Sequence, residues 1–142
     1  MSIQAVTHAV NVRREGRTVV ILDQTLLPNR TEYLTLSEPG ELWEAIHALR
    51  IRGAPAIGIF AAYSMAVLAA GIDAPDFDGF YREYRRLSDY LNSSRPTAVN
   101  LSHMLRRMDG VVVAHRDAPR AALLAALDRE AAAIHQEDMD MC

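Results

Sequence analysis

The chain has 142 residues, half of them hydrophobic, which suits a single domain with a sizeable core. Its formal net charge of −3 excludes the strongly basic surface typical of nucleic-acid-binding domains. The single cysteine, Cys142, excludes an intrachain disulfide framework, and the N-terminus lacks the apolar core of a signal peptide, so we expect a cytoplasmic protein.

The first third of the sequence has the pattern of short strands. Apolar and β-branched residues fill residues 5–12, 18–24 and 31–36, and the turn-forming stretches RREGR and LPNR separate them. Three short strands in succession predict a small antiparallel meander. A sheet of this size needs helices packed against it for stability.

From Ser37 onward the apolar residues recur with the period of helices. We expect Ser37 to cap a first helix that runs through Leu49, with Gly53 ending that segment. Further helices are predicted over residues 55–70 and 76–91, from near Pro96, and after Asp117. The predicted fold is α+β and mostly α: a three-stranded antiparallel β meander followed by about five helices.

One predicted helix could be mistaken for a membrane span. Residues 55–72 carry no charge, and 18 residues is near the minimum length for crossing a bilayer. The run is rich in Ala and Gly, contains Tyr63 and Ser64, and opens with a proline. We therefore expect a buried helix among other helices, and no membrane partner.

The last residues keep helical propensity to the end of the sequence, with no Gly, Asn or Pro to stop the helix. Glu137, Asp138 and Asp140 would lie at a helix C-terminus, where negative charge is unfavourable. We expect a chain cut within a helix, and a frayed acidic tail is the alternative.

Two stretches place an arginine before a proline that suits the first turn of a helix. They are RIRGAPAIG, residues 50–58, with Arg52, and NSSRPTAVN, residues 92–100, with Arg95. Free N–H groups at a helix N-terminus and a planar guanidinium both favour phosphate or carboxylate, and Gly53 would let an anion come close. Either stretch alone is better explained as a helix end with a solvated arginine. The pair together suits an anion site as well as it suits two such helix ends.

The remaining polar residues form no recognisable motif. The five histidines show no metal-ligand spacing, and the chain has no Ser/His/Asp set, no glycine-rich nucleotide loop and no zinc motif. Asp23 and Gln24 could reach a pocket or begin a turn, and Asn100 could bond a ligand or a neighbouring backbone. His135 and Asp138 are interpreted as a surface pair. The residues by themselves predict a binding half-site without catalytic groups.

Three stretches carry a family resemblance that covers nearly the whole chain: LDQTLLPNRTEYL, LWEAIHALRIRGAPAIGIFAAYSMAVLA and LNSSRPTAVNLSHMLRRM. They resemble the N-terminal domain of the methylthioribose-1-phosphate isomerases, which are translation-initiation-factor-2B-like. The wider family includes regulatory subunits of the guanine-exchange factor for translation initiation, and ribose-1,5-bisphosphate isomerase. The RGAPAIG and SSRPTAVN elements are specific to the isomerase branch. The resemblance implies one N-terminal domain, with residues 1–36 as the meander and 37–142 as a helical bundle, truncated before a Rossmann-like catalytic domain.

The same resemblance implies an aldose–ketose isomerase of methionine salvage, an intramolecular oxidoreductase that needs no cofactor and no metal. Its substrate would be S-methyl-5-thioribose 1-phosphate and its product S-methyl-5-thioribulose 1-phosphate. Arg52, Gly53, Ala54 and Arg95 match the family's substrate-binding elements. The family's catalytic cysteine and aspartate belong to the C-terminal domain, so no catalytic residue is expected in this chain, Cys142 included.

Two alternatives to this function stay open. The sugar could be 5-deoxyribose 1-phosphate, since only the substituent at carbon 5 differs. The chain could instead be a non-catalytic assembly module like the translation-factor relatives, although such a module has no need for two converging anion contacts. On the isomerase interpretation we expect a homo-oligomer, a dimer, and no activity from the 142 residues alone.

Overall fold

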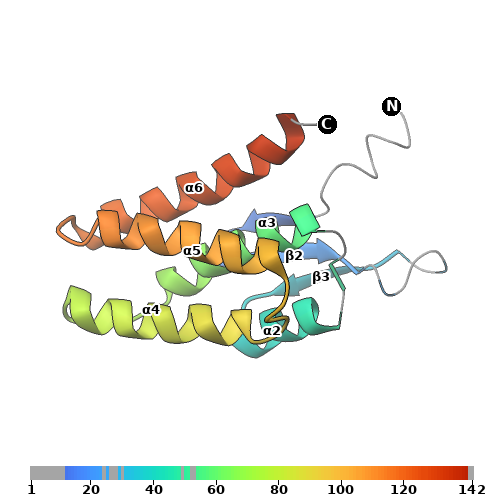
Figure 1. Cartoon of the computed structure of the whole chain (residues 1–142), viewed down its shortest axis with the longest axis horizontal. Coiled ribbons are helices and arrows are strands. Elements are labelled where there is room, and N and C mark those ends of the chain that lie inside the picture. The colour runs from blue at the N-terminus through green and yellow to red at the C-terminus, as the bar shows by residue number, and fades with distance from the viewer. Residues whose placement is uncertain are drawn as a thin grey trace.

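The computed structural model describes residues 12–23, 25, 29, 31–48, 50–51 and 54–140. Its elements are β1 (Val12–Glu15), β2 (Thr18–Leu22), β3 (Tyr33–Leu36), α2 (Pro39–His47), α3 (Ala54–Ala70), α4 (Phe77–Asn92), α5 (Val99–Ala114) and α6 (Arg120–Asp140). Figure 1 shows α6, α5 and α4 one above another, with the sheet and α2 towards one end. The described part thus confirms the predicted α+β fold, with its three-stranded antiparallel sheet and five helices.

The sheet is an antiparallel meander in the order β1–β2–β3. Glu15 pairs with Thr18, which leaves Gly16 and Arg17 as a two-residue hairpin loop. Gly16 has φ +61°, a left-handed conformation that glycine adopts without steric cost. The prediction that RREGR is all turn is therefore wrong, because a two-residue loop with a glycine suffices and β1 continues through Glu15. Of the first strand expected over residues 5–12, only Val12 lies within the described residues.

The N-terminus of α2 differs from the prediction by one residue. Glu38, not Ser37, is the N-cap, and Pro39 is the first helical residue. The Glu41 carboxylate accepts the backbone N–H groups of Ser37 and Glu38, each at 3.1 Å, and these hydrogen bonds lower the pKa of Glu41. Proline fits the first turn because its missing N–H would have no helical partner there. The helix ends at His47, and Leu49 and Gly53, with which it was expected to end, lie outside the described residues.

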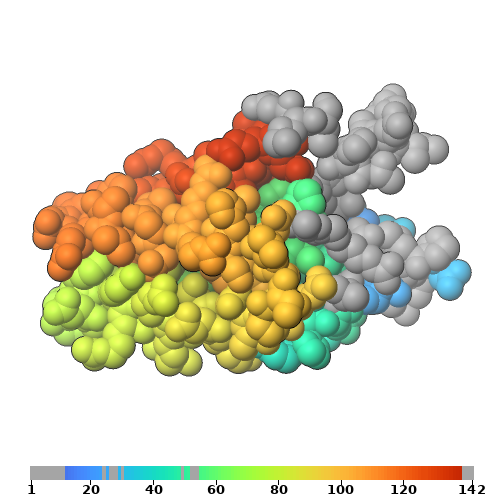
Figure 2. Space-filling view, in the orientation of Figure 1, coloured from blue at the N-terminus to red at the C-terminus, as the bar shows by residue number. Residues whose placement is uncertain are grey.

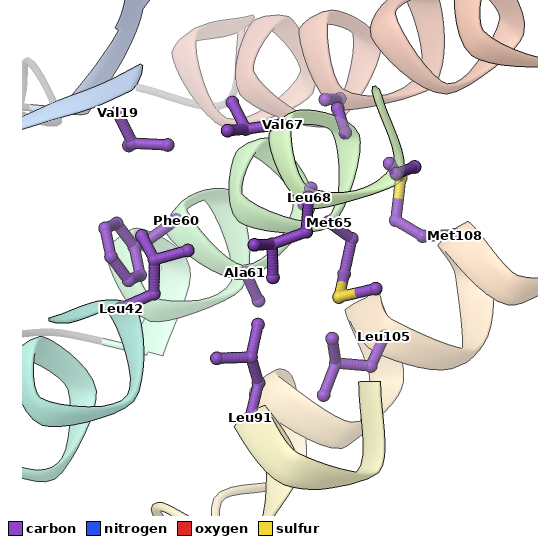
Figure 3. Close-up of a cluster of buried hydrophobic side chains, with 14 of the residues drawn as sticks. Val19, Leu42, Phe60, Ala61, Met65, Val67, Leu68, Leu91, Leu105 and Met108 are labelled. Carbon is purple, nitrogen blue, oxygen red and sulfur yellow. The ribbon is translucent and has the colours of Figure 1, made fainter. Parts of the chain in front are cut away.

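The charge-free helix α3 lies at the centre of the fold and packs against α4, α5, α6, β1 and β2. Its buried side chains include Phe60, Met65 and Val67, and Figure 3 shows them facing residues of the surrounding elements. A helix covered on all sides needs apolar residues around its whole circumference. The prediction of a buried helix is confirmed, and none of the helices in the described ranges is long and apolar enough to cross a membrane.

The other helices present one apolar face each to α3 or its neighbours. In α4 the buried residues are Phe80, Tyr84, Leu87, Ser88 and Leu91, and the Asp76 carboxylate caps the helix by accepting the Gly79 N–H at 2.8 Å. Helix α6 is held to α5 by Arg107, which pairs with Glu130 at 2.5 Å and with Glu137 at 2.6 Å. These contacts complete a helical layer whose outer surface is seen in Figure 2.

Candidate functional site

The first turns of α3 and α5 differ from those of α2 and α4 in charge. Helices α2 and α4 carry an acidic residue in the first turn, Glu41 and Asp78, whereas α3 and α5 carry none. The N-cap of α5 is Ala98, which has no side-chain acceptor for the free N–H groups. An N-terminus without an acidic side chain keeps its partial positive charge available to an external anion.

A glycine brings these two helix ends together. An added Cβ at Gly58, one turn into α3, would lie 2.8 Å from Met104 Cγ and 3.6 Å from the backbone oxygen of Asn100. Asn100 is the second residue of α5. Because glycine has no side chain, the backbone of α3 approaches the first turns of α5 closely. The N-terminal end of α3 therefore lies near the N-terminal end of α5.

Arg95 precedes α5 in a turn and does not stand directly before the helix. The Ala98 N–H donates to the Arg95 carbonyl oxygen at 2.9 Å, so residues 95–98 form a β-turn with Pro96 in its second position. The prediction that α5 begins near Pro96 is wrong: the helix begins at Val99. The fixed φ of proline suits both a first helical turn and the second position of a β-turn, and the chain uses the latter.

The guanidinium of Arg95 differs from those of the other partly buried arginines in its hydrogen-bond and ion-pair partners. Arg14, Arg50, Arg107 and Arg120 each donate to a carboxylate or to backbone carbonyl oxygens. Arg95 is also partly buried, yet its side chain has no hydrogen-bond or ion-pair partner among the described residues. Charged groups withdrawn from water are normally paired. Arg95 is therefore the described arginine best suited to meet an anion supplied from outside this part of the chain.

The other predicted binding residues, Arg52, Gly53 and Ala54, remain predictions. Arg52 and Gly53 lie outside the described residues, and Ala54 begins α3 without a described side chain. The segment that leads to them is firmly held. Arg50 donates to Asp23 at 2.7 Å and to Glu44 at 2.8 Å, and Ile51 is buried. The first arginine of RIRGAPAIG thus has a structural role.

Asp23 belongs to this structural support. It is 2% exposed, accepts hydrogen bonds from the Thr25 hydroxyl at 2.6 Å and the Thr25 N–H at 3.0 Å, and pairs with Arg50. Burial opposes its ionisation, but the hydrogen bonds from Thr25 and the charge of Arg50 outweigh burial and lower the pKa of Asp23. Both interpretations left open hold for Asp23: it begins a turn through the Thr25 N–H, and it lines an open cavity of about 510 Å³ together with Glu44 and Arg50. Gln24 lies outside the described residues.

The histidines in the described part of the chain have structural partners or lie at the surface. His135 bonds the Tyr63 hydroxyl at 2.8 Å, linking α6 to α3, and burial lowers the pKa of His135 against the opposing charge of Asp138. The interpretation of His135 as one half of a surface pair is incomplete, because it also contacts a buried helix. No group of three or more His, Cys, Asp or Glu side chains that could hold a metal occurs within the described ranges. Cys142 lies outside them.

A cavity of about 670 Å³ lies at the opposite end of α3 and is not part of this candidate site. Its lining includes Gly71 and Ile72, which follow α3, and the ion pair between Glu83 and Arg86. Because those two charges neutralise each other, they offer no net attraction for an anion. None of the predicted binding residues that the structure describes lines this cavity.

Comparison with known proteins gives relatives of two kinds. The chain is 52% identical over 123 residues to a methylthioribose-1-phosphate isomerase of Symbiobacterium thermophilum, covering 87% of this chain and 34% of the relative. It is 39% identical over 124 residues to a 5-deoxyribose 1-phosphate isomerase of Clostridium botulinum, covering 87% of this chain and 36% of the relative. The chain therefore spans about a third of the length of the curated relatives it matches.

Among solved structures, an isomerase and a translation initiation factor subunit share the fold of this chain. The 5-methylthioribose 1-phosphate isomerase of Pyrococcus horikoshii superposes with a TM-score of 0.85 at 31% identity, covering 89% of this chain and 36% of that one. The delta subunit of translation initiation factor eIF-2B from A. fulgidus gives 0.83 at 29% identity, covering 91% and 37%. The family model described as the initiation factor 2 subunit family matches residues 50–142, more than half of the sequence. The chain belongs to the initiation factor 2 subunit family.

Proposed function

We propose that this chain supplies part of the phosphate- and substrate-binding site of an aldose–ketose isomerase that acts on S-methyl-5-thioribose 1-phosphate. The observation that carries the proposal is the partly buried guanidinium of Arg95, without a partner in the described ranges, beside a helix N-terminus that lacks an acidic residue. The names of the relatives, which are isomerases of sugar 1-phosphates, support the substrate class.

The chemistry divides between binding and proton transfer. The substrate phosphate would be held by Arg95, together with Arg52, Gly53 and Ala54 at the start of α3. An aldose and its ketose are isomers, so the reaction needs no external oxidant or reductant, in keeping with the expected lack of a cofactor. We place the groups that move the proton in a C-terminal catalytic domain. Residues 1–36 and 37–142 together would form the N-terminal domain, and the 142 residues alone would be inactive.

Two other functions have a specific observation in their favour. The similarity to 5-deoxyribose 1-phosphate isomerases favours that sugar as an alternative substrate. The similarity to a translation initiation factor subunit favours a non-catalytic assembly module. An assembly module gives no reason for Arg95 to be left without an acidic partner, so the state of Arg95 favours the enzyme.

The test is a turnover assay of the full-length gene product on both sugar phosphates, in which ³¹P NMR monitors the conversion of substrate to product. We expect turnover of S-methyl-5-thioribose 1-phosphate, and we expect Arg95→Ala to raise KM about 10- to 100-fold, since hydrogen bonds to charged groups contribute about 1.5–3 kcal/mol. Arg106→Ala, which removes an exposed arginine of α5, is the matched control and should leave KM within about twofold. Light scattering on the same product tests the expected homodimer.

The outcomes separate the candidates. Turnover of only the 5-deoxy sugar would support the alternative substrate, and no turnover of either sugar would support the assembly module. Turnover with an unchanged KM in Arg95→Ala would support the isomerase activity and would show that Arg95 does not bind the substrate.

A further inference from the structure

Two neighbouring side chains of α2 contact the segment that carries Arg95. The Trp43 Nε1–H donates to the Ser93 hydroxyl at 2.9 Å, and His47 Nδ1 lies 3.1 Å from the Ser94 carbonyl oxygen. A carbonyl oxygen only accepts, so Nδ1 of His47 carries the proton in this hydrogen bond. Figure 2 shows the surface of the segment after α4, in gold, next to the surface of α2, in teal.

The two α2 side chains also support each other. Trp43 and His47 are four residues apart and so lie on one face of the helix. Their rings stack with centroids 4.5 Å apart at 23°, and Trp43 stacks on Tyr90 of α4 at 6.1 Å. Stacking fixes the ring planes and therefore the directions of both donors. The pair is a rigid support, whereas a single exposed donor would be free to rotate.

The segment needs such a support because its own hydrogen bonds are local. Between the end of α4 and the start of α5, the Ser93 and Ser94 hydroxyls donate to the Tyr90 and Leu91 carbonyl oxygens, each at 2.6 Å. The Ala98 N–H closes the turn on Arg95. These bonds shape the turns, but they join residues three positions apart and do not fix the segment relative to distant elements. Within the described ranges, the bonds from Trp43 and His47 do.

The same helix holds the other arginine-bearing stretch. Glu44, between Trp43 and His47 in sequence, pairs with Arg50 at 2.8 Å, two residues before Arg52. The last two turns of α2 are thus bonded to both stretches that the proposed function places around one phosphate.

We propose that Trp43 and His47 are positioning residues that hold Arg95 at the correct distance from the start of α3, so that both can contact one substrate phosphate. This inference rests on the proposed function, and neither side chain is assigned contact with the substrate. Arg95 contacts the phosphate in ground state and transition state alike, so a loose segment weakens binding and leaves the chemical step unchanged.

The test measures KM and kcat for S-methyl-5-thioribose 1-phosphate in the full-length gene product. Trp43→Phe keeps an aromatic ring and removes the N–H donor, and we expect KM to rise about 3- to 10-fold with kcat within about twofold. His47→Ala should act alike, and His47→Asn, whose amide can donate from a similar position, should restore KM. Tyr81→Phe is the matched control: it removes a 3.1 Å hydrogen bond to Asp109, between α4 and α5, and should leave KM unchanged.

A double-mutant cycle separates positioning from general stability. If Trp43 acts through Arg95, then Trp43→Phe should have no further effect on KM in an Arg95→Ala background. Full additivity, or an unchanged KM in Trp43→Phe, would overturn the inference.

A second measurement does not depend on turnover. Amide hydrogen exchange of residues 93–98 should quicken in Trp43→Phe and in Ser93→Ala, which removes the acceptor, but not in Tyr81→Phe. Unchanged exchange in both variants overturns the positioning role. A wild-type product that turns over neither sugar, with exchange responding as expected, overturns the proposed function and leaves the segment's support by α2 established.

Discussion

The side chains of Asp23 and Arg95 are both withdrawn from water, but only the Asp23 carboxylate has hydrogen-bond and ion-pair partners among the described residues. Asp23 receives hydrogen bonds from Thr25 and a charge from Arg50, and it supports the segment leading to Arg52. Arg95 has no such partner in the described ranges. A charge that is fully bonded holds the fold, whereas one left without a partner is available for binding.

The lowered pKa of Asp23 predicts a pH-dependent stability. Because the pKa in the folded state lies below the reference value of 3.8, Asp23 stabilises the fold above that pH, and the contribution is lost as the pH falls through the folded-state pKa. Asp23→Asn should lower the free energy of unfolding by about 2 kcal/mol at pH 7. It should also flatten the fall in stability below about pH 4, measured by urea unfolding at several pH values.

The control for Asp23 is Asp73→Asn, since Asp73 is exposed and its substitution should change the free energy of unfolding at pH 7 by less than about 0.5 kcal/mol. Parallel pH curves for wild type and Asp23→Asn would show that Asp23 has no special role in acid stability.

Among the elements, the contact between α3 and α5 depends on the absence of a side chain at Gly58. Alanine there would place its Cβ 2.8 Å from Met104 Cγ, well inside normal contact distance. We expect Gly58→Ala to lower the free energy of unfolding by about 1 kcal/mol, because the cost of overpacking exceeds the gain in helix propensity. In a Met104→Ala background the loss should disappear. Chemical denaturation of the four proteins gives the coupling.

Gly110→Ala is the matched control, because this glycine of α5 has nothing within 4 Å of an added Cβ. The substitution should raise stability by about 0.5–1 kcal/mol. If both glycine variants are stabilised, the close approach of α3 and α5 is not tight enough to position the candidate site.

A helix was predictable from the sequence where its residue pattern fits only one kind of secondary structure. The charge-free composition of α3 and the stripe of Phe80, Tyr84, Leu87 and Leu91 in α4 each indicate a helix with a defined buried face. The first residue of α5 was not predictable from the sequence, because Pro96 suits the first turn of a helix as well as a β-turn. Only the tertiary structure decides between them.

The candidate site was predictable in its residue types but not in its supports. Arg95 was singled out by its place before a proline. Trp43 lies within a stretch predicted only to be helical, and its hydrogen bond to Ser93 joins positions 50 apart. The ion pair of Arg50 likewise depends on Asp23, which is 27 positions away. Pairings over such separations leave no local pattern in a single sequence.

In the whole molecule, the central place of α3 predicts where the fold is most resistant to opening. Its amides should exchange with solvent only through global unfolding, because α4, α5, α6 and the sheet all cover it. Helix α6, which packs on α3 and α5 and is held at its outer edge by Arg107, should exchange faster, through local opening. Hydrogen exchange with mass spectrometry measures both, and equal protection of α3 and α6 would contradict this order.

The burial of α3 on every side also has a consequence for synthesis on the ribosome. α3 ends at Ala70, whereas α5 begins at Val99 and α6 at Arg120, so α3 is made well before two of the helices that cover it. At about 5–20 residues per second, this apolar helix waits for several seconds with its future contact surfaces uncovered. A nascent chain halted just after α4 should therefore recruit chaperones that bind apolar segments, and one extended past α6 should release them.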